Sequence, residues 1–141
     1  MGAVTVYLAD TSAWHRSQHP EVTRLWETRL AEDSLATCAQ IRLEILYSAR
    51  SGKDYERLAA ELMALHQLPC GSAEFDRALD IQQRLAFRGA LHHRSVKFAD
   101  LIVAAAAESG DAIVWHYDQD FDRIAAVTHQ PTEWVARRGS L

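Results

Sequence analysis

Four acidic side chains stand at positions where a lone charge is costly, and their types suggest one shared site. Asp10 and Asp118 directly follow apolar segments that are typical of buried strands. In open α/β sheets, ligands bind outside the carboxyl ends of the strands. Glu44 and Asp100 interrupt segments with the apolar pattern of core-facing helices. A carboxylate at the edge of a buried stretch needs a positive partner. We therefore expect these four residues to meet around a cation, with Asp120 as a fifth, less certain ligand.

The chemistry of such a site would be that of a hard divalent cation. Oxygen-only ligands suit Mg²⁺ or Mn²⁺, and four neighbouring carboxylates cannot all stay ionised without cations. Two divalent ions would balance the four negative charges. Each acid also has a local explanation that remains open. Asp10 would cap a helix, Glu44 would pair with Arg42 or Arg50, Asp100 would pair with Lys97, and Asp118 and Asp120 would be turn residues.

The elements that position these residues alternate between strand and helix. Periodicity and end signals predict strands at 4–9, 34–38 and 112–116, with weaker ones at 68–70 and 131–136. Helices are predicted from residue 10, after Pro20, and over 40–50, 55–65, 72–88, 95–109 and 121–127. This alternation predicts an α/β fold in which helices cover both faces of a small, mostly parallel central sheet.

Length and composition favour one globular domain. The chain has 141 residues, of which 48% are hydrophobic and 24% charged, which excludes collagen-like and disordered classes. We expect a single domain over 1–141, with 137–141 as a flexible tail. Fifteen Lys and Arg against 19 Asp and Glu give a formal net charge of −4. A strongly basic coat is therefore absent, so nucleic acid would be a partner only if metal ions supply positive charge.

The sequence also predicts a reducing compartment. Cys38 and Cys70 form no Cys-x-x-Cys pair, which favours buried free thiols in the cytoplasm. No stretch approaches the roughly 20 apolar residues of a membrane span, and the first ten residues lack the basic lead-in of a secretory signal. His92 and His93 have no Cys or His at zinc-finger spacing, so a solvated loop is expected there.

Four motifs together give the chain a family resemblance. They are LADTS at 8–12, RLEILYSAR at 42–50, FADLIVAA at 98–105 and HYDQDFDRI at 116–124. In this order and spacing they resemble the PIN-domain ribonucleases, and most of all the VapC toxins of toxin–antitoxin pairs. The resemblance extends from residue 4 to about residue 127 and implies a three-layer α/β/α domain. It also implies that Thr11 or Ser12 is a supporting hydroxyl beside the first acid.

The resemblance implies an activity and partners. The expected activity is a Mg²⁺- or Mn²⁺-dependent endoribonuclease that leaves a 5′-phosphate and a 3′-hydroxyl. Asp10, Asp100 and Asp118 would hold or order the first metal, while Glu44 would hold a second ion or position the attacking water. The implied partners are a VapB-type antitoxin and a second copy of the chain, and no membrane is involved. RNA would contact basic residues that flank the motifs: Arg42, Arg50, Arg94, Lys97 and Arg123, with Arg88, His92 and His93 nearby in sequence.

Other interpretations remain open at this stage. A catalytically silent PIN-like module that binds RNA or protein would keep the fold without needing four acids in register. A phosphoacceptor receiver lacks support because the chain has no early acidic pair. A haloacid-type phosphatase needs a second Asp two residues after Asp10, where Ser12 stands. Trp14, Trp26 and the apolar stripe over 55–65 could receive a partner helix, form a homodimer face or belong to the core.

Overall fold

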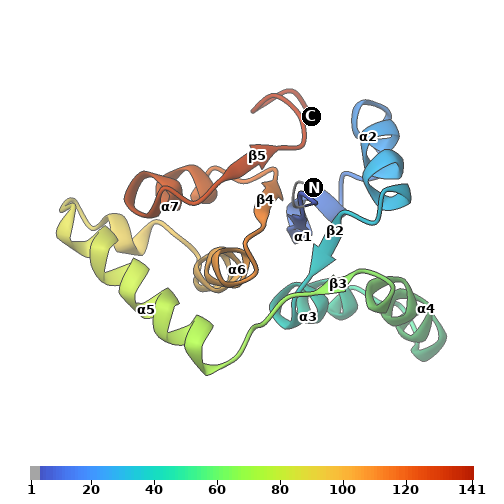
Figure 1. Ribbon diagram of the computed structural model, residues 1–141, viewed down its shortest axis with the longest axis horizontal. Coiled ribbons are helices and arrows are strands. Elements are labelled where there is room, and N and C mark those ends of the chain that lie inside the picture. Colours follow the sequence, from blue (N-terminus) through green and yellow to red (C-terminus); the bar gives the residue numbers. More distant parts are fainter. Residues whose placement is uncertain (1–3) are drawn as a thin grey trace.

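The computed structural model describes residues 4–141, and within them one parallel sheet organises the chain (Figure 1). The strand order is β3-β2-β1-β4-β5. The strands are β1 (Tyr7–Ala9), β2 (Leu35–Thr37), β3 (His66–Gln67), β4 (Ile113–His116) and β5 (Thr132–Trp134). The helices are α1 (Thr11–Trp14), α2 (Pro20–Ala31), α3 (Ala39–Tyr47), α4 (Gly52–Met63), α5 (Ser72–Phe87), α6 (Phe98–Ser109) and α7 (Asp120–Thr128), with a 3₁₀ turn η1 (His92–Arg94).

Every strand pair within the described residues is parallel, so all carboxyl ends of the strands lie at one edge of the sheet. Tyr7 lies opposite Leu35 on one side and Ile113 on the other, which places β1 between β2 and β4. Parallel neighbours need a crossover connection, and the intervening helices supply it. The predicted α/β class is confirmed, and the sheet is wholly rather than mostly parallel.

The side-chain alternation of the strands divides the core into two halves, which makes the molecule three-layered. Leu8 and Val114 face one side, where α3, α4, α5, α6 and α7 pack over them. Ala9, Leu35 and Trp115 face the other side, which α1 and α2 cover. Figure 1 shows the sheet between these two groups of helices. Because both faces are covered, the three central strands β1, β2 and β4 need apolar residues at successive positions, as their sequences have.

Several predicted boundaries differ from the structure: the strand predicted at 4–9 is limited to Tyr7–Ala9 and the helix predicted over 40–50 ends at Tyr47. Two further differences have specific contacts behind them. The weak strand expected at 68–70 forms at β3 instead, because His66 and Gln67 pair with β2 and only the Leu68 N–H continues the pairing, donating to Thr37 O at 2.9 Å. The helix expected from Ser95 begins at Phe98. The Ser95 hydroxyl donates to His92 O at 2.7 Å, which places it against η1, and Lys97 is the residue at the N-cap of α6.

The aromatic residues considered as a partner surface are largely core. Trp26 is buried, lies edge-on to Trp14 and stacks on Trp115 with ring centroids 5.5 Å apart. On the 55–65 stripe, Leu58 and Leu62 are buried in the other half of the core. Of the three interpretations left open for these residues, the core therefore holds for Trp26 and the buried leucines.

The ends of the chain and its thiols complete the fold. The Leu141 N–H donates to Tyr117 Oη at 2.9 Å, so the end of the predicted tail lies against the loop after β4. The first three residues of the predicted domain lie outside the described residues. Both cysteines are free, and burial raises the pKa of Cys38 to about 12. Within residues 4–141 no helix combines the length and apolarity needed to cross a bilayer.

Candidate metal centre

Three carboxylates converge at the carboxyl edge of the sheet. Asp100 lies in the first turn of α6, Asp118 follows β4, and Asp120 is the first residue of α7. One oxygen from each lies within 4.8 Å of the other two, a spacing at which a single metal ion can bind all three. Asp100 and Asp120 are buried, and Asp118 is partly exposed. The group is therefore reachable from solvent on the Asp118 side.

Backbone hydrogen bonds hold these acids in place. Asp118 Oδ1 accepts from the Asp120 N–H at 2.9 Å, and Asp120 Oδ2 accepts from the Lys97 N–H at 3.1 Å. Asp120 thus caps the start of α6 from 23 residues away. The Asp118 N–H donates to His116 Nδ1 at 3.1 Å. Asp118 and Asp120 are therefore turn and helix-start residues, as the local interpretation has it, and each also places an oxygen within 4.8 Å of one of Asp100.

Asp10 is fixed at the end of β1 by a relay of hydrogen bonds. Its Oδ2 accepts from the Ser12 N–H at 3.1 Å, which caps α1, and from Ser12 Oγ at 2.5 Å. Ser12 Oγ in turn accepts from the Tyr117 N–H at 2.9 Å. Burial raises the pKa of Asp10, and the charge of Asp118 raises it further against the hydrogen bonds from Ser12. The relay therefore couples the end of β1 to the end of β4.

Glu44 reaches toward the same edge from α3. Its Oε2 accepts from Thr11 Oγ1 at 3.2 Å. Partial burial raises the pKa of Glu44, as does the charge of Asp10. The two predicted supporting hydroxyls thus serve different acids, Ser12 for Asp10 and Thr11 for Glu44. Neither Asp10 nor Glu44 belongs to the tight group of three. The charge of Asp10 raises the pKa of Asp100, whereas Glu44 interacts with the charges of Asp10 and Lys97.

The negative charges of the tight group, Asp100, Asp118 and Asp120, are not fully balanced by the surrounding protein. Burial raises the pKa of Asp100, and so do its hydrogen bond with Asp120 and the charges of Asp10 and Asp118. Burial acts to raise the pKa of Asp120 as well, but hydrogen bonds from Asp100 and Lys97 leave that pKa lowered. The two acids are therefore tightly coupled, and the pKa of Asp100 is the one that burial and the neighbouring acids raise. Asp100 Oδ2 is buried and has no hydrogen-bond partner among the described residues.

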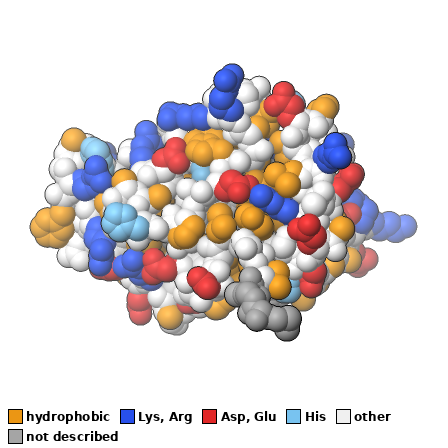
Figure 2. Space-filling view, turned by 45° about the horizontal axis from the view of Figure 1, so that its top comes forward, with side chains coloured by type: hydrophobic (Ala, Val, Ile, Leu, Met, Phe, Trp, Pro, Cys, Tyr) orange, Lys and Arg blue, Asp and Glu red, His pale blue; other side chains and the backbone are white. Residues whose placement is uncertain are grey.

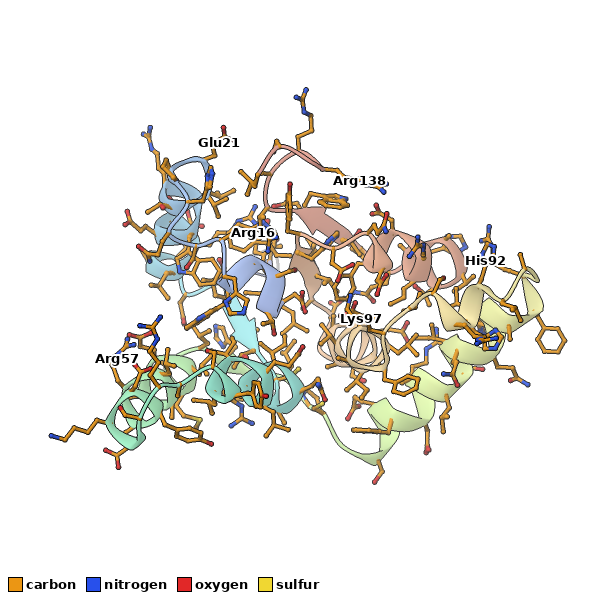
Figure 3. The ribbon with its side chains drawn as sticks, turned by 180° about the vertical axis from the view of Figure 1, so that it is seen from behind. Arg16, Glu21, Arg57, His92, Lys97 and Arg138 are labelled. Carbon is orange, nitrogen blue, oxygen red and sulfur yellow. The ribbon has the colours of Figure 1, made fainter. Side chains whose placement is uncertain are left out.

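Basic residues border the group unevenly. Lys97 Nζ lies 2.7 Å from Asp118 Oδ2, 3.2 Å from Asp120 Oδ2 and 3.3 Å from Asp100 Oδ2. Arg123 Nη1 lies 3.2 Å from Asp120 Oδ1. In Figure 3, Lys97 lies at the start of α6 in the middle of the molecule. The local explanation of Asp100 as a partner of Lys97 is therefore incomplete, since the ammonium contacts all three acids.

The other predicted RNA contacts lie farther along the surface. Arg42 Nη1 approaches Met63 Sδ at 3.7 Å, and the Arg50 N–H donates to Asp54. Neither arrangement pairs Glu44, so the structure does not support that local explanation. Arg94 is exposed at the end of η1. On the face drawn in Figure 2, basic and acidic side chains are interspersed, in keeping with the net charge of −4.

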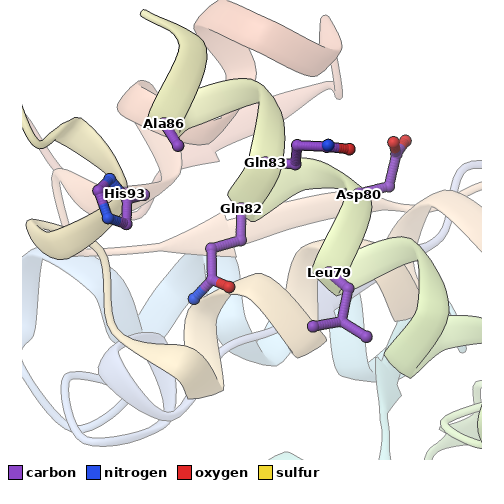
Figure 4. A pocket seen from close by; sticks show the side chains of 6 residues that line it. All are labelled: Leu79, Asp80, Gln82, Gln83, Ala86 and His93. Carbon is purple, nitrogen blue, oxygen red and sulfur yellow. The ribbon is translucent and has the colours of Figure 1, made fainter. Parts of the chain in front are cut away.

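Concave surface is a poor guide to this site. A cavity of about 470 Å³ lies between α5 and η1 (Figure 4), lined by Leu79, Asp80, Gln82, Gln83, Ala86 and His93. None of the converging carboxylates contributes to it. Sequence reasoning missed the central position of Lys97 and ranked Asp120 behind Asp10 and Glu44. One signal in the sequence could have raised the rank of Asp120. Asp118 and Asp120 flank the start of a predicted helix, where acidic residues act as caps and are held in fixed positions.

The fold and this acidic edge define a known class of protein. The family model of the PIN domain matches residues 7–127, which include all the elements from β1 to most of α7. The chain therefore belongs to the PIN-domain family.

Curated relatives give the narrower assignment. The chain is 54% identical to Ribonuclease VapC18 of Mycobacterium tuberculosis over 136 residues, which cover 96% of this chain and 99% of that protein. It is 43% identical to Ribonuclease VapC21 of the same species over 137 residues, covering 96% and 98%. Within the PIN-domain family, the chain belongs to the VapC ribonucleases.

Solved structures support the fold independently. The DNA-bound VapBC structure from Salmonella typhimurium superimposes with a TM-score of 0.72 at 19% identity, covering 94% of this chain and 100% of that one. VapBC2 from Rickettsia felis, bound to a fragment of its promoter, gives 0.71 at 14% identity, covering 92% and 98%. At such low identity the agreement concerns the fold alone.

Proposed function

We propose that this chain is the toxin of a toxin–antitoxin pair, an endoribonuclease that hydrolyses RNA with Mg²⁺ or Mn²⁺. The observation that carries the proposal is the convergence of Asp100, Asp118 and Asp120 within 4.8 Å of one another. The relatives that this chain matches over almost their full lengths are named ribonucleases, which supports the same activity. Asp10 and Glu44 complete the acidic edge in this proposal.

The residues present suit a divalent metal ion. All the donors are carboxylate oxygens, which Mg²⁺ and Mn²⁺ prefer. The buried Asp100 Oδ2 makes no hydrogen bond among the described residues and has the Lys97 ammonium 3.3 Å away, so its lone pairs are available to a metal ion that displaces the ammonium. Asp10, Asp100 and Asp118 would hold the first ion, with Asp120 beside them, and Glu44 would hold a second ion or position water. When bound, the metal supplies a hydroxide near neutral pH and screens the charge of the phosphodiester.

The protein's own groups orient the reaction. Ser12 holds Asp10 against β4, and Thr11 holds Glu44 toward the same edge. Because these acids stand on strand ends and helix starts, their oxygens need little reorganisation when substrate binds. We propose that Arg94 and Arg123 contact RNA phosphates beside the acids, with Arg42 and Arg50 on the α3 side. Cleavage with these groups would leave a 5′-phosphate and a 3′-hydroxyl.

The proposal extends to partners and compartment. A cognate VapB-type antitoxin would cover the active edge, and two of the structural relatives are VapBC complexes. A cavity of about 370 Å³ between α1, α2 and α4, where Trp14 and Leu58 meet the polar side chains of Gln18, Arg57 and Glu61, would receive a partner side chain. The chain would act in the cytoplasm and pair with a second copy. Native mass spectrometry with and without the antitoxin tests both assemblies.

The central experiment measures RNA cleavage against metal. The purified chain is incubated with labelled RNA in Mg²⁺, in Mn²⁺ and in excess chelator. We expect cleavage only with metal, and we expect Asp100→Asn to lower the rate by at least about 100-fold, because it removes a ligand charge. Asp76→Asn makes the same chemical change at an exposed position of α5 and should leave the rate unchanged.

The outcomes separate the proposed enzyme from the alternatives. Equal cleavage in chelator, or equal rates for Asp100→Asn and Asp76→Asn, would contradict a metal-dependent reaction at this site. A chain that binds RNA without cutting it under any metal condition would instead be the silent PIN-like module. Chemical mapping of the new ends then checks the 5′-phosphate.

A further inference from the structure

Lys97 occupies the position that a metal ion would share. Its Nζ contacts one oxygen each of Asp118, Asp120 and Asp100, at 2.7, 3.2 and 3.3 Å. These are the same three residues whose oxygens lie within 4.8 Å of one another. The ammonium thus neutralises part of the charge that would otherwise drive the carboxylates apart.

An ammonium group and a divalent ion cannot both stay in this place. Both are cations, and they would compete for the same oxygen lone pairs at separations where repulsion is strong. Arg123 is placed differently, because its Nη1 contacts Asp120 Oδ1 rather than Oδ2 and also donates to Ser95 O at 3.3 Å. Of these two cations, Lys97 is the one that must move.

The side chain of Lys97 is built to withdraw without disturbing the backbone. It is 64% exposed, whereas the side chain of Asp100 is 5% exposed. Its backbone N–H donates separately to Asp120 Oδ2 at 3.1 Å, so the start of α6 stays capped when the ammonium leaves. The flexible four-carbon stem allows the charged end to reach solvent.

From this geometry we infer that Lys97 is a tethered counter-ion that holds the three carboxylates together before metal binds and withdraws when metal arrives. The inference rests on the metal site of the proposed function and deepens it. Lys97 therefore has two opposite effects. It stabilises the metal-free fold, and it weakens the affinity of the three carboxylates for metal. A released ammonium also remains attached one helical turn from Asp100, beside the place where an RNA phosphate would meet the metal.

The first test compares Lys97→Met with Lys53→Met. The chain has only these two lysines, and Lys53 is exposed on α4, so it provides a matched control. Calorimetric titration should show Mn²⁺ binding to Lys97→Met about 3- to 10-fold more tightly than to the wild type, because a competing charge is gone. The metal-free Lys97→Met protein should melt at a lower temperature, and Lys53→Met should match the wild type in both measurements.

The second test observes the side chain directly. In protein labelled with ¹³C at lysine Cε, two signals are expected, and Lys53→Met assigns them. Addition of Mg²⁺ should shift the Lys97 signal and leave the Lys53 signal in place. Tighter Mn²⁺ binding together with this shift supports the inference.

Two outcomes would overturn the inference alone, and a third would overturn the proposed function together with it. Weaker or unchanged Mn²⁺ binding by Lys97→Met would show that the ammonium does not compete. An unmoved Lys97 signal in protein that demonstrably binds metal would show that it does not withdraw. If the wild-type chain binds neither Mn²⁺ nor Mg²⁺, the proposed function itself fails, and this inference falls with it.

Discussion

At the scale of single residues, Ser12 shows how a small side chain can connect two strand ends. Its hydroxyl donates to Asp10 Oδ2 and accepts from the Tyr117 N–H, while its own N–H also donates to Asp10. Groups that orient a ligand in this way affect catalysis even though they do not touch the metal. Ser12 therefore serves the proposed site by holding Asp10 in one orientation.

We expect Ser12→Ala to lower the rate of metal-dependent RNA cleavage by about 10- to 100-fold, since Asp10 loses a hydrogen bond and its link to β4. Circular dichroism should show a folded protein. Ser48→Ala, at an exposed hydroxyl that donates only to Ile45 O at 2.6 Å, serves as the control. Equal cleavage by the two variants would show that the relay has no part in the reaction.

At the scale of elements, β4 joins the site to the core. His116 ends this strand with its ring fully buried, between Phe121 of α7 and Trp134 of β5, at centroid distances of 5.0 and 4.9 Å. Its Nδ1 accepts from the Asp118 N–H, and its Nε2 has no partner among the described residues. Burial lowers the pKa of His116 to about 4, against the opposing charges of Asp122 and Asp118.

This burial predicts a pH dependence of stability. The unfolded chain takes up a proton at His116 below about pH 6.5, whereas the folded chain does so only near pH 4. The contribution of the neutral ring is therefore complete above pH 6.5 and is lost as the pH falls from 6.5 toward 4, by up to about 1.4 kcal/mol per pH unit. Denaturant unfolding of the metal-free chain between pH 7.5 and 4.5 measures the net pH dependence. The raised pKa of Asp100 contributes to it with the opposite sign, so the His116 loss is read from a comparison with a His116 variant.

His116→Phe isolates the contribution of the ring. The variant loses an acceptor for the Asp118 N–H at every pH, so it should be less stable than the wild type at pH 7.5. Because it cannot bind the proton, the gap should narrow as the pH falls. A gap that stays constant down to pH 4.5 would mean that His116 titrates alike in the folded and unfolded chain.

At the scale of the whole molecule, the charged side chains must both form an acidic metal site and allow a negatively charged RNA to bind. The chain carries a formal charge of −4, yet the proposed substrate is a polyanion. Asp100, Asp118 and Asp120 gather at the carboxyl edge of the sheet, and on the face drawn in Figure 2 basic and acidic side chains are interspersed. Binding of RNA should therefore depend on a few separate arginine contacts together with metal, rather than on one broad basic patch.

We expect the affinity for single-stranded RNA to fall with salt, with a slope of about −0.7 per phosphate contact in a plot of log affinity against log salt. Measured in the Asp100→Asn background, where RNA stays intact, Arg94→Gln should make the slope less steep by about 0.7. Arg24→Gln, at an exposed position of α2, should leave it unchanged. Fluorescence anisotropy checks this, and identical slopes for the two variants would exclude a phosphate contact at Arg94.

The sequence alone determined the class of fold and where most of the acids would stand. Alternating strand and helix patterns predicted the parallel sheet, and the ends of β1 and β4 placed Asp10 and Asp118 at one edge. These inferences succeed because hydrophobic periodicity and capping act between residues that are near one another in the chain.

Only the tertiary structure decided which groups meet. The start of α6 depends on a hydrogen bond from Lys97 to Asp120, 23 residues away, and so the helix begins later than its local cap signal at Ser95 suggested. The tight grouping of Asp120 with Asp100 and the three contacts of the Lys97 ammonium arise from the packing of α6 and α7 against β4. Distances between residues so far apart in the chain depend on how whole elements pack, and local propensities contain no record of that packing.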